Sequence, residues 1–133
     1  MKIQSATDYA IRILQYLHMN KEDICAAATI AAAIGITYPR FTKIASQLKK
    51  DGLLYAEQGR KGGYRLGIPA NLISVYDVFL CIEGELSLSR CFQADYICKQ
   101  GDLSHCRLRN LFGDMQTHLI EQMAQQTIED LVI

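Results

Sequence analysis

The fold is decided by residues 37–50, which read TYPRFTKIASQLKK. Apolar residues recur there at helical spacing and predict one buried stripe, formed by Phe41, Ile44, Ala45 and Leu48. The opposite side carries residues spaced at i, i+3, i+7 and i+10, namely Arg40, Lys43, Gln47 and Lys50. Thr37 is placed to cap this helix. A basic helix face of this width fits the major groove of DNA, so the helix is predicted to read a duplex.

A glycine-rich, basic hairpin is predicted directly after this helix. Residues 53–58 and 64–66 have the composition of two short strands, and the segment between them reads Gly59-Arg60-Lys61-Gly62-Gly63. The glycines allow a tight turn in which backbone approaches phosphates closely, and the tip carries two cations. A basic helix followed by such a hairpin indicates a winged helix-turn-helix DNA reader.

Helical spacing predicts the remaining elements. We expect helices over residues 8–19, 26–34, 74–83 and 107–125, with Thr7 or Ser5 as the N-cap of the first. The fold class is therefore mostly α with a small β-hairpin. A winged helix-turn-helix DNA-binding domain is predicted over residues 1–67. Residues 68–133 are predicted to hold a cysteine-bearing loop and a long C-terminal dimerisation helix, partly packed with the first helix.

The long C-terminal helix has an apolar seam. Its members recur at intervals of 3, 4 and 4 and are Leu108, Leu111, Met115 and Leu119. This spacing is typical of a coiled-coil-like interface and predicts a homodimer. Packing of the same stripe onto the chain's own core is the alternative interpretation.

The formal net charge of zero conceals an asymmetry between the two halves of the chain. Residues 1–67 contain ten Lys and Arg against five Asp and Glu, whereas residues 68–133 contain four against nine. The basic half indicates a polyanion partner, and we expect double-stranded operator DNA. Because no apolar run is long enough to cross a bilayer, we expect a cytoplasmic protein with no membrane partner. The sequence has no pattern typical of an enzyme active site.

The five cysteines divide into two groups. Cys25 and Cys81 lie in apolar runs and are expected to be small core residues. Cys91, Cys98 and Cys106 have the spacing C-x6-C-x7-C in a polar, loop-like stretch. Disulfides are rare in a reducing compartment, and thiolates are soft ligands that suit iron–sulfur clusters and zinc. Three thiolates are one short of a closed ligand set.

Three short motifs accompany the predicted helices: GRKGGYRL at residues 59–66, SATDYA at residues 5–10 and IEG at residues 82–84. Together with the three cysteines and the long last helix, they resemble the Rrf2 family of bacterial transcription regulators over nearly the whole chain. The resemblance implies a homodimer that binds a pseudo-palindromic operator. Many members sense iron–sulfur status, nitric oxide, redox state or cysteine supply. The residues in the middle of the predicted recognition helix differ from those common in the family, so base preference does not carry over.

The resemblance also implies a set of cluster ligands. In cluster-binding members a fourth ligand that is not cysteine joins three cysteines near this place. Some use a histidine shortly after the third cysteine, but residues 107–109 here are Arg, Leu and Arg. The nitric-oxide-sensing branch uses an aspartate near the N-terminus of the other subunit, where Asp8 stands in this chain. A 2Fe-2S or 4Fe-4S cluster is therefore implied, with the ligands Cys91, Cys98, Cys106 and Asp8.

Other readings of these residues remain open. His105 is a local competitor for the fourth ligand position, and an acidic residue such as Asp8 in a first helical turn also favours the helix dipole without any metal. The cysteines also suit zinc, or a metal-free thiol regulator of the same fold that responds to a small molecule or a partner protein. A small redox or electron-transfer protein ranks lower, because it has no use for a basic wing.

The predicted DNA-binding residues are Thr37, Tyr38, Arg40, Lys43, Gln47, Lys50, Gly59, Arg60, Lys61 and Gly62. Arg40 and Lys43 are expected to contact base edges or phosphates, since Arg reads guanine edges bidentately and Lys supplies a point charge. Thr37 and Tyr38 lie at the helix N-terminus, where side chains donate hydrogen bonds to phosphates. The alternatives are an ordinary solvated basic face and a winged helix that binds only protein.

Overall fold

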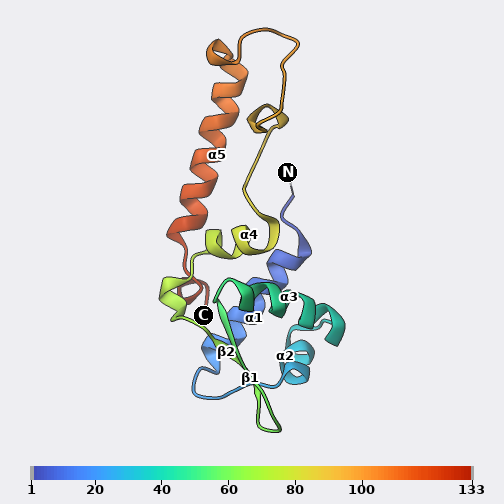
Figure 1. The fold of residues 1–133 in the computed structure, drawn as a ribbon. Helices are drawn as coiled ribbons and strands as arrows, with labels where there is room; N and C mark the ends of the chain where they lie inside the picture. Colours follow the sequence, from blue (N-terminus) through green and yellow to red (C-terminus); the bar gives the residue numbers. More distant parts are fainter. Residues whose placement is uncertain (1, 133) are drawn as a thin grey trace.

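A computed structural model describes residues 2–132 as a mostly helical chain with one β-hairpin (Figure 1). The helices are α1 (Ser5–Met19), α2 (Ala27–Ile34), α3 (Tyr38–Lys50), α4 (Val75–Glu83) and α5 (Arg107–Gln125). The hairpin is formed by strands β1 (Leu54–Glu57) and β2 (Gly63–Leu66), which pair antiparallel. The predicted fold class is confirmed, and α3 and α5 have the predicted bounds to within one residue.

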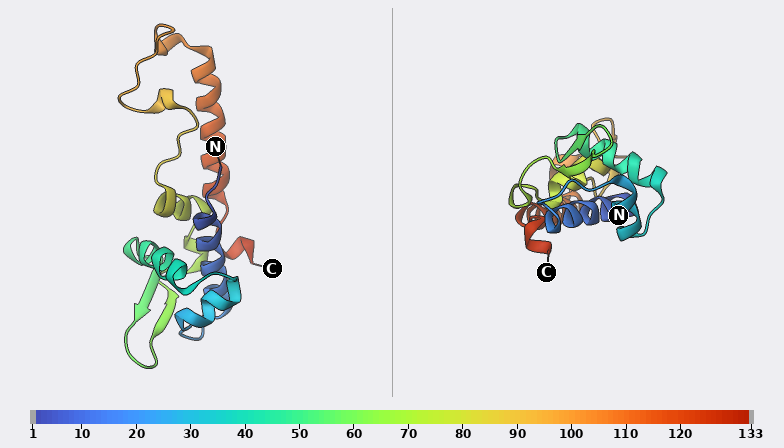
Figure 2. Two further views of the ribbon diagram at one scale, coloured as in Figure 1. Left: turned by 90° about the vertical axis from the view of Figure 1, so that its right-hand side faces the viewer. Right: turned by 90° about the horizontal axis from the view of Figure 1, so that it is seen from below.

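The molecule consists of a body and a long arm. Helices α1 to α4 and the hairpin form the body, and α5 extends away from it together with the segment that follows α4 (Figure 1). Viewed from the side, α3 and the hairpin project from the same side of the body, and α1 lies behind them (Figure 2). A helix-turn-helix and its wing are thus presented together to one side.

The core of the body gathers apolar side chains from both halves of the sequence. Its fully buried large residues are Ile13, Leu14, Leu17, Ile30, Phe41, Ile44, Leu48, Ile73, Val78 and Ile128. Ile128 follows α5, and its N–H donates a hydrogen bond of 2.9 Å to the Ile73 carbonyl. The C-terminal segment therefore returns from the arm to complete the core. The functional division at residue 67 stays a prediction.

The hairpin is fixed to the body at its base. Tyr64 of β2 packs edge-on against Phe41 of α3, with ring centroids 5.3 Å apart. The backbone of Tyr64 also pairs with that of Cys25 through two hydrogen bonds of 3.0 and 2.8 Å. Because Cys25 precedes α2, the hairpin is tied to both helices of the helix-turn-helix, and only its tip projects.

The start of α1 differs from the prediction. The helix begins at Ser5 instead of Asp8, its N-cap is Gln4, and neither Thr7 nor Ser5 caps it. The physical reason is a distant partner: the Glu83 carboxylate at the end of α4 accepts hydrogen bonds from the Gln4 N–H and the Thr7 hydroxyl. A carboxylate from α4, and not a side chain of the same turn, therefore binds the N-terminal end of α1.

Candidate nucleic-acid interface and cysteine segment

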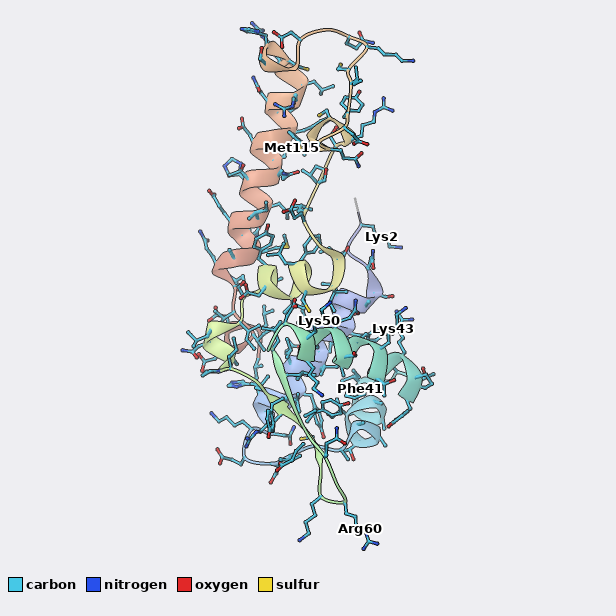
Figure 3. The ribbon with its side chains drawn as sticks, viewed as in Figure 1. Lys2, Phe41, Lys43, Lys50, Arg60 and Met115 are labelled. Atoms are coloured by element: carbon cyan, nitrogen blue, oxygen red, sulfur yellow. The ribbon has the colours of Figure 1, made fainter. Side chains whose placement is uncertain are left out.

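Helix α3 presents the predicted basic face to solvent. Its apolar stripe is buried in the core, as predicted, and Arg40, Lys43 and Lys50 are exposed while Gln47 is half-buried. The α3 helix begins where expected because the Thr37 hydroxyl accepts a hydrogen bond of 3.3 Å from the Arg40 N–H. Lys43 and Lys50, which are labelled in Figure 3, lie about two turns apart along α3. This face is accessible to a large partner.

The tip of the hairpin carries Arg60 and Lys61, both exposed, at the point farthest from α5 (Figure 3). Two glycines make the turn possible for different reasons. Gly59 has a φ of 103°, which L side chains rarely adopt. At Gly62 a Cβ would lie 2.1 Å from the Glu57 carbonyl oxygen, so no side chain fits there. The turn is thus built to hold two cations on a narrow projection.

The cations of this surface are electrostatically available. Within residues 2–132 the ion pairs join only Arg12 to Asp8 and His105 to Asp102, so none of the α3 or wing cations is neutralised by a carboxylate. Arg40 nevertheless has neighbours on α1. Its guanidinium lies over the Tyr9 ring, 5.0 Å from the centroid, and donates a hydrogen bond to the Ser5 hydroxyl.

Sequence reasoning missed this involvement of α1. A hollow of about 610 Å³ lies between the first turn of α1 and α3, and its wall includes Ala6, the N-cap Thr37 and the α3 residues Arg40, Lys43 and Gln47. Periodicity within α3 gives no signal for such a contact, because Ser5 and Arg40 are 35 positions apart. The candidate interface therefore includes the start of α1.

The three candidate ligand cysteines lie together in the segment between α4 and α5. All three line one cavity of about 310 Å³, along with Arg90, Tyr96 and Arg109. The thiols are half-buried and each has a local polar neighbour: Cys91 contacts the Ser89 hydroxyl at 3.2 Å, and Cys98 and Cys106 accept backbone N–H bonds of 3.3 and 3.4 Å.

The chemistry of this cavity suits an iron–sulfur cluster. Three soft thiols face it, and the buried Nε of Arg109 in its wall has no hydrogen-bond partner among the described residues. Thiolate-bound clusters accept hydrogen bonds at their sulfurs, so an unpaired cationic donor matches such a group. The three thiols are not close enough together to bind one metal ion, however, since no three His, Cys, Asp or Glu side chains in residues 2–132 form a metal-binding group.

The two candidate fourth ligands lie outside this cavity. Asp8 is exposed on α1, where its carboxylate pairs with the Arg12 Nε at 3.1 Å. His105 is exposed beside Asp102, with 3.2 Å between its Nδ1 and the carboxylate. Hydrogen bonds from Ser104, and then from His105, lower the pKa of Asp102. Neither candidate lines the cavity within one chain.

The other two cysteines are packed into the body, as predicted. Cys25 is buried, and Cys81 is half-buried against the same core. The Cys81 thiol donates a hydrogen bond of 3.2 Å to the Gln47 carbonyl, which ties α4 to α3. Burial, followed by the neighbouring Asp51, raises the pKa of Cys81 to about 12. This thiol is therefore protonated and unreactive at neutral pH.

Comparison with known proteins places this arrangement among bacterial regulators. Residues 3–133 match the sequence profile of the Rrf2 family, described as an iron-dependent transcriptional regulator. Protein aau3 of Rhizobium meliloti is 33% identical over 133 residues, which span 99% of this chain and 85% of that protein. The HTH-type transcriptional regulator NsrR of Shouchella clausii is 30% identical over 135 residues, spanning 100% and 89%.

The fold is shared with a solved structure. CymR, the global cysteine regulator of B. subtilis, superimposes with a TM-score of 0.82 at 23% identity, covering 98% of this chain and 95% of that one. In the part of the chain that the structure describes, no helix has the length and apolarity that crossing a membrane requires.

Proposed function

Because the chain belongs to the Rrf2 family of transcriptional regulators, we propose that it binds operator DNA as a homodimer and responds to a cluster in its cysteine segment. The family consists of regulators and not enzymes. The observation that carries the DNA-binding proposal is the joint presentation of α3 and the hairpin on one side of the body, with cations that are free of ion pairs within residues 2–132 (Figure 2).

In this proposal α3 enters the major groove and the hairpin follows the adjacent backbone. Arg40 and Lys43 reach base edges or phosphates, and Gln47 and Lys50 continue the same face. Thr37 and Tyr38 donate to phosphates from the N-terminal end of α3. The wing contact consists of Gly59, Arg60, Lys61 and Gly62, whose backbone and two cations approach phosphates.

The exposed half of α5 supports the homodimer. Leu108, Leu111 and Met115 are 57%, 54% and 51% exposed, although they lie at coiled-coil spacing. Farther along the same helix, Leu119 and Met123 pack against α4. The seam is therefore divided: its second half covers the chain's own body, and its first half is left for a second copy. A symmetric pair would place two α3 helices about one duplex turn apart.

For the sensor we propose that Cys91, Cys98 and Cys106 hold an iron–sulfur cluster and that Asp8 of a second copy completes the ligand set. When bound, such a group supplies reactivity toward oxidants and nitric oxide. The Arg109 guanidinium would donate to a cluster sulfur, and Asp8 would join the cysteine segment of one copy to α1 of the other. Loss of that connection would change the relative position of the two α3 helices and lower operator affinity.

A metal-free thiol regulator of the same fold is the second candidate. It is favoured by the separation of the three thiols, which do not form a metal-binding group within residues 2–132. Their cavity, with Arg90 and Arg109 in its wall, would then take a small anionic molecule or a peptide from a partner protein.

One experiment tests both operator binding and the presence of an iron–sulfur cluster. The chain is purified anaerobically and used to select duplexes from a random pool, while iron, acid-labile sulfide and the visible spectrum are measured. We expect enriched two-fold symmetric sequences with half-sites separated by about 10 base pairs, and a coloured protein. Absence of iron and sulfide would refute the cluster but leave the regulator. Failure to enrich any sequence would refute DNA binding.

A further inference from the structure

Arg40 is held differently from the other cations of the candidate interface. Its guanidinium lies over the Tyr9 ring at 5.0 Å and donates to the Ser5 hydroxyl, so two residues of α1 fix an α3 side chain. An arginine that is held in one orientation loses less side-chain entropy when it pairs with a base. The contact therefore bears on which base pair Arg40 can read, beyond supplying positive charge.

The α1 turn that holds Arg40 is itself fixed by α4. The Glu83 carboxylate accepts hydrogen bonds from the Gln4 N–H, at 3.2 Å, and from the Thr7 hydroxyl. Thr7 is only 1% exposed, so its hydroxyl depends on this partner. The first turn of α1 has no side-chain cap of its own, so the Glu83 carboxylate is a contact from outside the helix that can hold this turn in place.

Glu83 also marks the boundary with the cysteine segment. It is the last residue of α4, and Gly84 follows with a φ of 82° before the chain runs toward the three cysteines. A continuous series of contacts thus leads from the end of α4 through the first turn of α1 to Arg40 on α3. Glu83 contacts Gln4 and Thr7, the backbone of α1 connects these to Ser5 and Tyr9, and the last two contact Arg40.

We propose that Ser5 and Tyr9 are specificity-determining residues that position Arg40, and that Glu83 positions the turn that carries them. This inference rests on the proposed DNA-binding function and adds α1 to the sequence-reading machinery. Ser5 and Tyr9 act through Arg40, so their removal lowers discrimination between base pairs. It leaves the number of phosphate contacts, and hence the salt dependence of binding, unchanged.

The first test uses the duplex that the wild-type chain selects and a set of its single base-pair variants. Loss of the ring and the hydroxyl in Ser5→Ala/Tyr9→Leu is expected to reduce discrimination at one base pair about tenfold. Leucine keeps the apolar packing of Tyr9 against the core, and Tyr9→Phe, which keeps the ring, is expected to retain most of the discrimination. The slope of log affinity against log salt should stay that of the wild type.

The decisive comparison repeats Ser5→Ala/Tyr9→Leu in an Arg40→Ala background. If α1 acts through Arg40, the α1 substitutions cause no further loss of discrimination there. An equal loss with and without Arg40 would overturn the proposal, and so would an unchanged discrimination in the presence of Arg40. Should the wild-type chain select no duplex at all, the proposed function fails, and this inference fails with it.

The positioning role of Glu83 is tested with three variants. Glu83→Gln keeps an acceptor for Gln4 and Thr7 and is expected to retain discrimination, whereas Glu83→Ala should lose it about as fully as the α1 variant. Glu85→Ala is the control, because it removes the same charge from an exposed position nearby. Equal behaviour of Glu83→Ala and Glu85→Ala would show that Glu83 does not position α1.

Discussion

Substitution of Arg60 at the tip of the hairpin offers a quantitative test of the DNA interface. The side chain is exposed, lies at the end of the projecting hairpin, and has no ion pair within residues 2–132 (Figure 3). Arg60→Ala therefore removes a free cation without disturbing the core. If each protomer of a dimer neutralises one phosphate with Arg60, the variant loses two phosphate contacts.

The size of the effect follows from counterion release. Each lost phosphate contact lowers the salt slope by about 0.9, so two contacts lower it by about 1.8. Between about 50 and 200 mM salt, the wild type should then lose roughly tenfold more affinity than Arg60→Ala. Fluorescence anisotropy with the selected duplex, titrated at several salt concentrations, measures both slopes.

A matched control removes the same charge at the other end of the molecule. Lys99 is exposed in the cysteine segment, which lies at the opposite end from the hairpin (Figure 1). Lys99→Ala should leave the slope unchanged. A wild-type slope in Arg60→Ala, or the same reduction in Lys99→Ala, would remove the hairpin from the interface.

Three other perturbations test the packing around the site. At about pH 8, iodoacetamide should alkylate Cys91, Cys98 and Cys106 well before Cys25 and Cys81, because burial raises the pKa of both core thiols. Mass spectrometry of the quenched reaction measures the order in which the thiols react. Ile128→Ala should lower the free energy of unfolding by about 2–5 kcal/mol in chemical denaturation, because it opens a cavity in the core. A much smaller loss would show that the C-terminal segment is not packed against the core in solution. Met115→Glu should convert a dimer to a monomer in sedimentation experiments, because it places a charge in the exposed apolar seam. Gln122→Glu, also at an exposed position of α5, should leave the dimer intact. A dimer that survives Met115→Glu would exclude the exposed seam as the interface.

Features set by neighbouring residues could be predicted from the sequence. The stripe of α3, its Thr37 cap and the bounds of α5 depend on spacing of a few residues, and each is found as predicted. The predicted start of α1 was wrong, because the carboxylate that accepts a hydrogen bond from the Gln4 N–H belongs to Glu83, 79 positions away. No local pattern reveals such a partner, and the same holds for the contact of Arg40 with Tyr9.

The cysteine segment, too, could be predicted from the sequence only in part. The spacing of the three cysteines indicated a common site, and the structure places all three on one cavity. The cationic wall was missed, because Arg90 and Arg109 have no motif of their own and come together only through the path of the chain. The sequence therefore predicted the grouping of the three cysteines but not the two arginines in the wall of their cavity.

The divided seam of α5 has a mechanical consequence. The helix has 19 residues, so it is about 28 Å long, and it is anchored to α4 only near its C-terminal end. In the proposed sensor the helix would act as a rigid arm that pivots at the body and carries Cys106 at its far end. A displacement of about 5 Å at that end corresponds to a rotation of only about 10° at the pivot, given this length. Chemistry at the tip would thus reach the body as a small, well-defined tilt.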